Sequence, residues 1–587
     1  GFTLDTPLKV AHLGIDSVVS IVDDVLIEKM RRMLCSQFDL TYNAISEKME
    51  DFRAKRITSY LNLLNDLVTA RFNDLKNGSR DSLKEIRKYL DLLPNNEELI
   101  AQFKTLTNNF DSLADLRTWL DRNLAPGSID VNIMTKLDKP NHFKGQPLGH
   151  EHNDAHAALR GYAKSELESS VVFSAGMNPR LYSYLEKFDD FFPDSNGKIK
   201  KKVILKVSDY RSALIQGKFL AKKGIWVSEF RIESGLNCGG HAFATEGSLM
   251  GPILEEFVGN RKELAETLEG LLIDALRDKN RTIPEKSPKI RITAQGGVGT
   301  AEEHRLLIER YELDSVGWGS PFLLVREATT VDQETLGKLV AADEKDLYLS
   351  NISPLGVPFN NLKDNSKDLE KIEKIQTGRP GSPCPKEYLA LHAQPESRSL
   401  CTASRQYQRN KIKLLDRDEL SEEEFNKNYN DIVEKACLCM GLGEASMQVY
   451  DLDPSADKKG VAICPGPNMA YFSSIMSLRE MADHIYGRIN VIAKKNRPQM
   501  FVKELQLYLS YLSSKIDEIQ GVPSKKQQKY LNAFSKNLQD GIDYYRSFTE
   551  QVKDMYKEGF ERIEEELSLQ NADMNKLQER LALLQLS

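Results

Sequence analysis

In Ile292-Thr293-Ala294-Gln295-Gly296-Gly297-Val298-Gly299-Thr300, an apolar strand is predicted to run directly into a glycine-rich turn. A helix is predicted to begin at Ala301-Glu302-Glu303. Glycines let backbone N–H groups approach an anion closely, and the N-terminus of the following helix adds a favourable dipole. The stretch therefore predicts a strand–turn–helix unit that binds a phosphate.

The same pattern recurs one predicted unit later, in Val316-Gly317-Trp318-Gly319-Ser320. Two consecutive loops of this kind form the usual phosphate site of TIM-barrel enzymes. The residues expected to bind the phosphate are Gly296, Gly297, Val298, Gly319 and Ser320.

An upstream strand ends in Glu233-Ser234-Gly235-Leu236-Asn237-Cys238-Gly239-Gly240-His241. This order places His241 at the C-terminal mouth of a barrel, where catalytic groups lie. An imidazole at that position can exchange a proton near neutral pH. We expect His241 to be catalytic and Gly239 and Gly240 to contact the bound ligand.

Short β-branched runs alternate with helical stretches, which favours an α/β protein with a TIM (β/α)8 barrel. The expected strands are Leu8–Leu13, Ile129–Met134, Val171–Ser174, Lys202–Val207, Phe230–Glu233, Ile290–Ala294, Ser315–Trp318 and Leu347–Asn351. The predicted organisation is the start of the barrel in 1–45, a helical insertion in 46–124, the rest of the barrel in 125–360, a cysteine-containing segment in 361–495 and a helical extension in 496–587.

The helical extension contains the turn Gly521-Val522-Pro523-Ser524, which separates two predicted helices, with Ser524 as N-cap of the second. A hairpin that docks on the barrel is one interpretation. A coiled coil that forms a homodimer is the other.

The motifs resemble those of the nitronate monooxygenase (2-nitropropane dioxygenase) family. Cys238-Gly239-Gly240-His241 is similar to its Ala-Gly-Gly-His signature, Gly296-Gly297-Val298 to its Gly-Gly-Ile loop, and Val316–Phe322 to its Val-x-x-Gly-Thr-x-Phe segment. Ser353–Pro358 resembles the Ser-Pro-x-Gly-x-Pro stretch after the barrel, and Val131-Asn132 resembles a Val-Asn pair that contacts flavin. Flavin-dependent enoyl reductases share the same barrel and similar glycine motifs.

The resemblance implies an FMN oxidoreductase in which residues 125–360 bind the cofactor, Asn132 contacts the flavin and His241 transfers a proton beside it. Nitronate oxidation is the first hypothesis, and reduction of an enoyl thioester with NADH or NADPH is the alternative. A barrel that serves only as a non-catalytic scaffold is the third. Asn237 and Cys238 depart from the family pattern, which leaves the substrate and the proton route open.

The resemblance also implies that the two glycine loops follow the seventh and eighth strands, whereas the residue pattern makes those strands the sixth and seventh. An additional early strand over Phe38–Ala44 would reconcile the two counts and would leave Leu347–Asn351 outside the barrel.

The net charge and the hydropathy of the chain limit the classes of partner that we expect it to bind. The chain of 587 residues has 80 basic and 86 acidic side chains, a net charge of -6, which gives no electrostatic reason to bind nucleic acid. No apolar run is long enough to span a membrane, and Gly1–Asp5 shows no basic region followed by an apolar stretch, so no secretory signal is expected. We therefore expect a cytoplasmic protein that acts on a small molecule.

Two groups of side chains suggest metal binding as a minor alternative. Gly149–His156 contains three histidines and two carboxylates, although a polar loop at the barrel mouth explains it more simply. Five cysteines cluster after the barrel, and their spacing matches neither a zinc ribbon nor a common ferredoxin. Buried reduced thiols are the main interpretation and an iron–sulfur or zinc site the alternative, with the candidates Cys384, Cys401, Cys437, Cys439 and Cys464.

Overall fold

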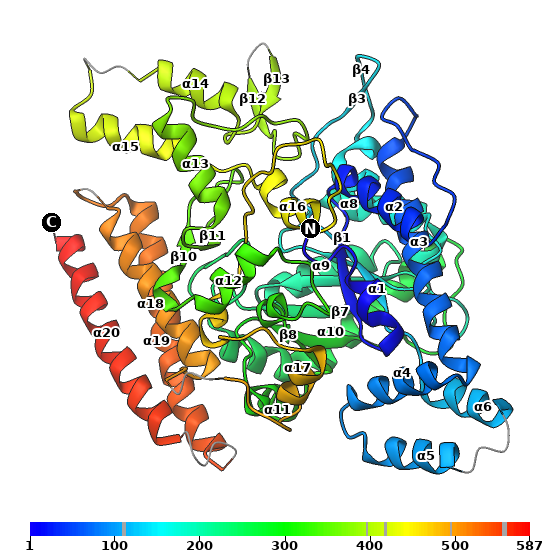
Figure 1. Cartoon of the computed structure of the whole chain (residues 1–587). Coiled ribbons are helices and arrows are strands. Elements are labelled where there is room, and N and C mark those ends of the chain that lie inside the picture. Colours follow the sequence, from blue (N-terminus) through cyan, green and yellow to red (C-terminus); the bar gives the residue numbers. More distant parts are fainter. Residues whose placement is uncertain are drawn as a thin grey trace.

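A parallel sheet of seven strands forms the centre of the protein (Figure 1). The computed structural model describes residues 1–108, 113–394, 397–415, 419–492, 496–519, 521–554 and 560–586. The strands follow one another in chain order, and every neighbouring pair is parallel. They are β1 (Ser17–Ser20), β2 (Ile129–Ile133), β5 (Ser170–Phe173), β6 (Lys202–Val207), β7 (Val227–Glu233), β8 (Arg291–Gln295) and β9 (Ser315–Gly317).

The sheet is curled, and this curl brings the ends of its two edge strands to one cavity. Ser20 ends β1 and Gly317 ends β9, and both contribute to that cavity. In the described part of the chain no strand pairing joins β9 to β1. Instead, the N–H of Thr330 donates to the carbonyl of Phe2 at 2.8 Å, so the segment after β9 packs on the segment before β1. The described residues therefore form a curled parallel sheet of seven strands, and the predicted closed barrel of eight strands is not confirmed.

Two of the expected early strands are wrong. Leu8–Leu13 is helical, as α1 (Thr6–Val10) and the 3-10 turn η1 (Ala11–Leu13), because Pro7 favours the first helical turn and Gly14 ends it at φ +80°. Phe38–Ala44 forms no strand and follows the end of α2 (Asp24–Gln37). The actual first strand, β1, has only four residues and no long apolar run.

The predicted strand Leu347–Asn351 exists but lies outside the main sheet. Here β10 (Leu347–Ser350) pairs antiparallel with β11 (Phe359–Leu362) in a separate hairpin. Tyr348 and Leu349 are exposed, which does not suit a strand covered on both faces. The Gly296 and Gly319 loops consequently follow the sixth and seventh strands, as the residue pattern predicts and the family count does not.

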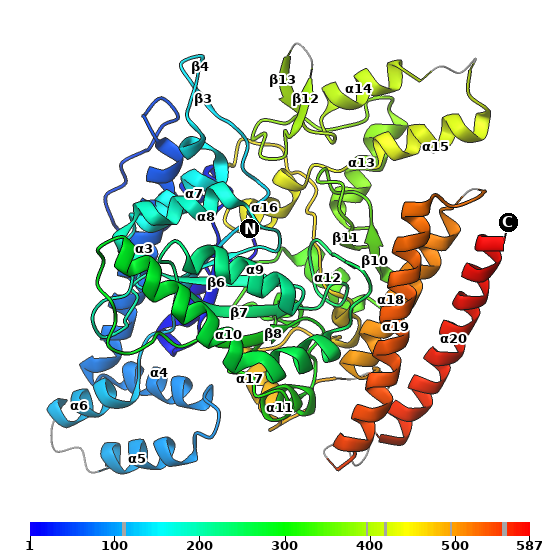
Figure 2. The same cartoon turned by 180° about the vertical axis from the view of Figure 1, so that it is seen from behind.

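Helices follow most strands and cover the sheet. In Figure 2, α9 lies over β6 and β7, both of which it contacts, and α10 contacts β7. The helices of this region are α2, α3 (Phe52–Asp74), α7 (Asp154–Ala163), α8 (Pro179–Tyr184), α9 (Tyr210–Ala221), α10 (Met250–Asp278) and α11 (Ala301–Arg310), and α12 (Gln333–Ala341) follows β9. A small hairpin of β3 (His142–Phe143) and β4 (Gln146–Pro147) lies between β2 and α7.

Four helices occupy the region of the predicted insertion. The first, α3, packs on α2 and α7 beside the sheet, so closely that a side chain at Gly161 would meet Ile57 at 2.8 Å. The next three, α4 (Arg80–Asp91), α5 (Glu97–Asn108) and α6 (Leu113–Asn123), project from the body (Figure 1). Their buried side chains belong to a second hydrophobic core that includes Leu116 and Leu120.

The segment after β9 wraps back over the cavity. Its elements beyond β11 are α13 (Ser366–Gln376), β12 (His392–Gln394), β13 (Ser397–Leu400), α14 (Arg405–Lys413), α15 (Glu422–Val433), α16 (Leu438–Val449), the 3-10 helix η8 (Pro467–Tyr471) and α17 (Leu478–Ile485). Cys464, Gly466 and Asn468 line the same cavity as the strand ends. Residues more than 200 positions from β7 thus reach the mouth of the sheet.

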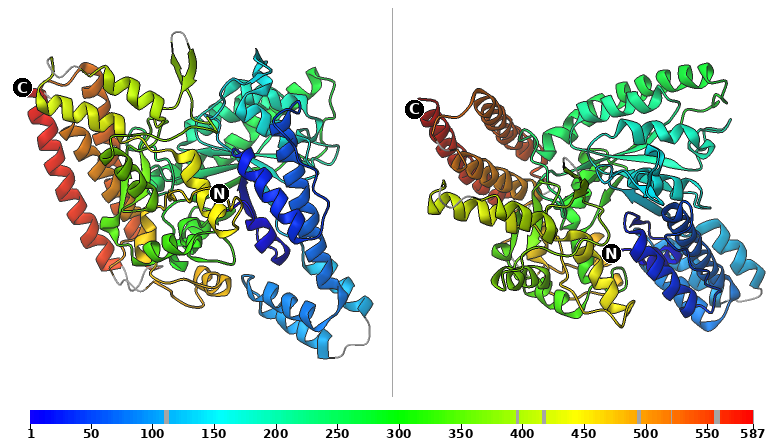
Figure 3. Two further views of the ribbon diagram at one scale, coloured as in Figure 1. Left: turned by 45° about the horizontal axis from the view of Figure 1, so that its top comes forward. Right: turned by 90° about the horizontal axis from the view of Figure 1, so that it is seen from above.

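The helical extension consists of three helices, α18 (Met500–Asp517), α19 (Lys525–Val552) and α20 (Phe560–Leu586). They pack on one another, and α19 also packs on α10. Seen from above, this bundle and α4–α6 lie on opposite sides of the sheet (Figure 3). Ser524 is confirmed as the N-cap of α19, since its side chain accepts from the N–H of Gln527. Homodimerisation through these helices stays a prediction.

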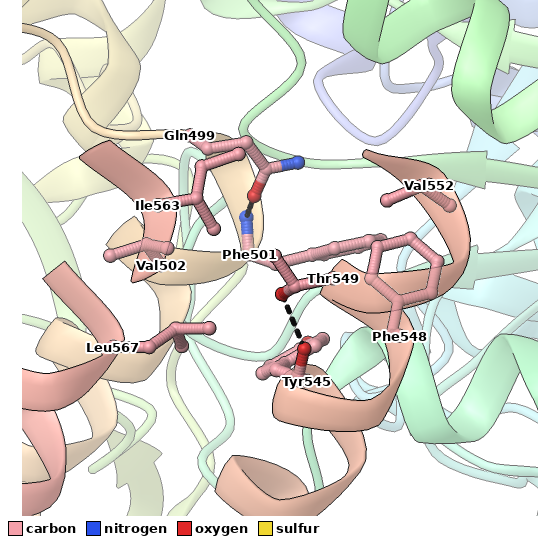
Figure 4. A pocket seen from close by; sticks show the side chains of 9 residues that line it. All are labelled: Gln499, Phe501, Val502, Tyr545, Phe548, Thr549, Val552, Ile563 and Leu567. Carbon is pink, nitrogen blue, oxygen red and sulfur yellow. Dashed lines mark hydrogen bonds between the residues drawn. The ribbon is translucent and has the colours of Figure 1, made fainter. Parts of the chain in front are cut away.

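The bundle encloses a small apolar cavity lined by residues such as Phe501, Tyr545 and Phe548 (Figure 4). Its volume is about 20 Å³, which suffices for about one water molecule. This cavity is a packing gap and not a ligand site. No helix in the described ranges is long and apolar enough to cross a bilayer.

Candidate active site

One cavity of about 450 Å³ lies at the carboxyl ends of the strands. This volume falls in the range of roughly 300–1,000 Å³ that is typical of cofactor and small-molecule sites. All nine residues predicted to be catalytic or cofactor-binding line it: Asn132, Gly239, Gly240, His241, Gly296, Gly297, Val298, Gly319 and Ser320. The structure thus brings together residues that are up to 188 positions apart, from Asn132 to Ser320.

The loop between β8 and α11 requires glycine for steric reasons. Gly297 has φ +82°, and a Cβ there would lie 2.0 Å from Nδ2 of Asn237. Thr300 caps α11, because its side chain accepts from the N–H of Glu303. The loop therefore ends at an ordered helix N-terminus, which is the arrangement that favours an anion.

Four backbone N–H groups of the two glycine loops remain available. None of the hydrogen bonds found in the described ranges uses the N–H of Gly297, Val298, Gly319 or Ser320. Val298 is buried, Gly297 and Ser320 are half-buried and Gly319 is exposed. A buried N–H group is nearly always paired in folded proteins, so the N–H of Val298 in particular indicates a ligand that accepts a hydrogen bond.

Gly239 and Gly240 are held by the post-barrel segment. The N–H of Gly240 donates to the carbonyl of Cys464 at 3.0 Å, and a Cβ at Gly239 would lie 2.8 Å from that same oxygen. The carbonyl of Gly240 accepts from the N–H of Asn360 at 2.9 Å. These two glycines line the cavity, but their backbone groups mainly fix the loop that carries His241.

His241 is bound to a buried serine. Its Nε2 lies 2.6 Å from Oγ of Ser353, and Oγ also accepts from the N–H of Leu355 at 3.2 Å. Ser353 is completely buried, so its hydroxyl hydrogen needs an acceptor, and Nε2 is the one in contact. This network assigns the ring proton to Nδ1, which leaves an N–H donor for a ligand.

The imidazole of His241 is neutral near pH 7. Burial, together with the nearby positive charge of Lys136, lowers its pKa to about 4. A neutral imidazole can donate a hydrogen bond from Nδ1, but it is a poor source of a free proton at neutral pH. This refines the predicted role as a proton-transfer residue.

Charged residues that the sequence does not single out also line the cavity. Burial lowers the pKa of Lys136, whose ammonium lies 4.3 Å from the ring centre of Phe243. No salt bridge to Lys136 is present in the described ranges. Lys206 and Glu233 form an ion pair at 3.6 Å, and Glu233 also accepts from Gln295. Lysines at strand ends have no distinctive local pattern, so sequence reasoning misses them.

Asn237 is a second residue whose contribution depends on the structure. It is 2% exposed, and its Nδ2 donates to the carbonyl of Met500 at 3.2 Å. Its Oδ1 is buried without a hydrogen-bond donor. Asn132, in contrast, donates from Nδ2 to Oγ of Ser20 at 3.2 Å, across β1 and β2.

These groups fit FMN. The unpaired N–H groups of the glycine loops match a phosphate, and the unpaired Oδ1 of Asn237 matches a hydroxyl or ring N–H donor. The cavity of about 450 Å³ is in the size range of a cofactor site.

The metal alternatives lack a suitable geometry. In the ranges that the structure describes, no three histidine, cysteine or acidic side chains converge to hold a metal ion. In the Gly149–His156 loop, His156 is fully buried and its Nδ1 lies 2.9 Å from Oδ2 of Asp138, while its ring centre lies 5.6 Å from that of His150. The minor alternative of a zinc or iron site in this loop is not supported in the described ranges.

The post-barrel cysteines are free thiols. Burial raises the pKa of Cys437 and Cys439, a hydrogen bond with Cys384 together with burial raises that of Cys401, and burial raises that of Cys464 to about 11. These raised pKa values describe thiols without a metal ion, and a bound metal ion would itself deprotonate its cysteine ligands. In the described ranges these side chains form no group that could hold a metal ion, so iron–sulfur or zinc binding by Cys384, Cys401, Cys439 and Cys464 is not supported.

Comparison with known proteins gives only distant similarities. No protein-family model and no curated protein matches the chain. Among solved structures, it is similar to FabK from Thermotoga maritima, with 14% identity and a TM-score of 0.30 over 68% of this chain and 84% of FabK. It is also similar to the enoyl reductase domain of MlnA from the macrolactin biosynthesis cluster of Bacillus amyloliquefaciens, with 16% identity and a TM-score of 0.35 over 64% of this chain and 86% of that domain. These values are too low to assign an activity, so the function is inferred from the cavity.

Proposed function

We propose that this chain is an FMN-dependent oxidoreductase that reduces a double bond conjugated to a carbonyl group. One observation carries the proposal: two glycine loops with unpaired N–H groups and a neutral histidine with a free N–H face one cofactor-sized cavity. FMN, when bound, supplies the electron-pair chemistry that side chains lack.

The residues of the chain have separate roles in this proposal. The N–H groups of Gly297, Val298, Gly319 and Ser320 bind the cofactor phosphate, and Asn237 accepts a hydrogen bond from the rest of the cofactor. His241 donates from Nδ1 to the carbonyl oxygen of the substrate, which polarises the conjugated double bond. The charge of Lys136 stabilises the negative charge that develops on that oxygen.

The pKa of His241 favours this reaction over proton abstraction. A histidine with a pKa of about 4 is a weak base, so it removes a proton from a carbon acid inefficiently. Its neutral N–H remains a hydrogen-bond donor over the whole neutral range. The family resemblance also implies nitronate oxidation, and one assay can decide between the two reactions.

The test begins with the purified chain and added FMN under anaerobic conditions. We expect flavin absorption to remain with the protein, NADH or NADPH to bleach it, and an enoyl thioester to restore it. Bleaching of the flavin by a nitronate, and not by NADH or NADPH, would replace the proposed reaction with nitronate oxidation. A chain that binds no FMN would contradict the proposal and favour a non-catalytic scaffold.

A histidine variant tests the role of the side chain. His241→Ala should retain FMN and lose turnover by about 10²-fold or more. His142→Ala is the matched control, because His142 is exposed on β3, away from the cavity lining. Unchanged turnover of His241→Ala would remove this histidine from the reaction.

A further inference from the structure

Arg497, directly before α18, reaches the loop that is proposed to bind phosphate. Its Nη2 donates to the carbonyl of Gly297 at 2.8 Å, and its Nε donates to Oδ1 of Asn468 at 3.0 Å. We propose that Arg497 is a positioning residue that orients the N–H groups of this loop toward the anion. The inference rests on the proposed function only for the identity of that anion as the FMN phosphate.

Three consecutive carbonyl groups of the loop are bound by the C-terminal part of the chain. Arg497 binds the carbonyl of Gly297, Nδ2 of Asn468 binds that of Val298 at 2.8 Å, and Nε2 of His484 binds that of Gly299 at 2.8 Å. Nδ1 of His484 accepts from the N–H of Val491 at 3.2 Å, so its Nε2 carries the proton that is donated. All three donors lie between α16 and α18, 170 to 200 positions from the carbonyl groups that they bind.

The bound carbonyls determine where the N–H groups point. In a trans peptide the C=O of one residue and the N–H of the next point in opposite directions. Because Arg497 holds the carbonyl of Gly297, the N–H of Val298 points away from Arg497. Val298 lines the cavity, and its N–H has no partner in the ranges that the structure describes. The arginine thus fixes the direction of a donor to the anion.

Arg497 also neutralises a carboxylate next to the loop. Its Nη1 lies 2.6 Å from Oε1 of Glu303 and its Nη2 lies 2.9 Å from Oε2, with side chains that are only 7% and 2% exposed. Glu303 in turn accepts from the N–H of Gly299 at 2.9 Å and from the N–H of Met500 at 2.8 Å. A buried carboxylate at the first turn of α11 would repel a phosphate if it were unpaired.

The helical extension therefore contributes to the site and does not merely attach to the barrel. The contacts of Arg497, Met500 and Asn237 join the start of α18 to both cavity loops, since Asn237 donates to the carbonyl of Met500. A loop held from outside in this way is pre-organised for its ligand, which reduces the entropy lost on binding.

Arg497→Ala tests the inference in the full-length chain. We expect FMN to bind at least tenfold more weakly, and amide hydrogen exchange in residues 296–300 to accelerate even without FMN. Arg488→Ala is the matched control, because Arg488 binds Asp483 and the carbonyl of Asp91 and does not contact the loop. The control should show wild-type affinity and exchange.

The double variant Arg497→Ala/Glu303→Gln separates positioning from general destabilisation. Removing the unpaired carboxylate should restore part of the FMN affinity that Arg497→Ala loses, whereas a merely structural role predicts a further loss. If Arg497→Ala does not fold, Arg497→Lys is the second variant. It keeps the positive charge but loses the bidentate geometry of the guanidinium group, so it should still weaken FMN binding severalfold.

Several results would overturn the inference. Wild-type FMN affinity and exchange in Arg497→Ala would do so, as would equal affinity of Arg497→Lys and the wild type if the alanine variant is unfolded. A wild-type chain that binds no FMN contradicts the proposed function instead, and hydrogen exchange of the loop then decides the positioning role alone.

Discussion

Replacing Gly297 with alanine is the most specific perturbation of the proposed phosphate loop. Gly297 has φ +82°, a region that costs an L residue about 1–2 kcal/mol. The new Cβ would also lie 2.0 Å from Nδ2 of Asn237, which is buried and bonded to Met500. Overpacking of this kind costs typically about 1–3 kcal/mol. The sum, about 2–5 kcal/mol, exceeds the 1.4 kcal/mol that corresponds to a tenfold change in Kd.

The assay is a titration of each variant with FMN, followed by quenching of flavin fluorescence. We expect Gly297→Ala to bind FMN at least tenfold more weakly than the wild type. Gly270→Ala is the control, because Gly270 lies within α10 and a Cβ there meets nothing within 4 Å. The control should bind normally and be stabilised by roughly 0.5–1 kcal/mol. Wild-type affinity of Gly297→Ala would refute the assignment of this loop to the cofactor.

Two further predictions concern buried titratable groups. Complete burial raises the pKa of Glu504 to about 7, so the native state holds more protons than the unfolded state between about pH 4.5 and 7 and loses stability as the pH rises through that window. At about 1.4 kcal/mol per pKa unit, the loss of folding free energy is on the order of 3 kcal/mol. The Tm of Glu504→Gln should therefore rise relative to that of the wild type between pH 5 and pH 8. A difference in Tm that does not depend on pH would contradict this account. Cys401 and Cys437 are buried with raised pKa values, so a thiol reagent should modify them only after unfolding, and rapid modification of the native protein would show that they are accessible.

The sequence predicts the strands whose residues have strong local patterns. β2, β5, β6, β8 and β9 are short apolar runs followed by glycine or polar residues, and each lies within a few residues of its predicted position. β1 is missed because Ser17–Ser20 offers only two apolar side chains, while the longer apolar run at Leu8–Leu13 begins with a proline-started helix. Leu347–Ser350 does not join the main sheet as an eighth strand, because it pairs antiparallel with β11.

The residues of the candidate site also fall into two groups, those that a local sequence pattern predicts and those that it does not. Gly296, Gly297 and His241 are recognisable because glycine at a strand end and a histidine after it are local signals. The same loops are contacted by Arg497, Asn468 and Glu504, which lie more than 160 positions away in the sequence. The residues next to these three form no local pattern that predicts the contacts. Their contribution depends on how the C-terminal part of the chain folds back over the sheet, which is a tertiary property.

The most direct test of the central claim compares FMN with riboflavin, which lacks only the phosphate. Hydrogen bonds to charged groups contribute about 1.5–3 kcal/mol each, so even two of the four loop N–H groups on the phosphate should give FMN an advantage of roughly a hundredfold in Kd. Isothermal titration of the purified chain with each flavin measures that ratio. We predict that FMN binds about a hundredfold more tightly than riboflavin, and equal affinities for the two would contradict a phosphate site in the Gly296 and Gly319 loops.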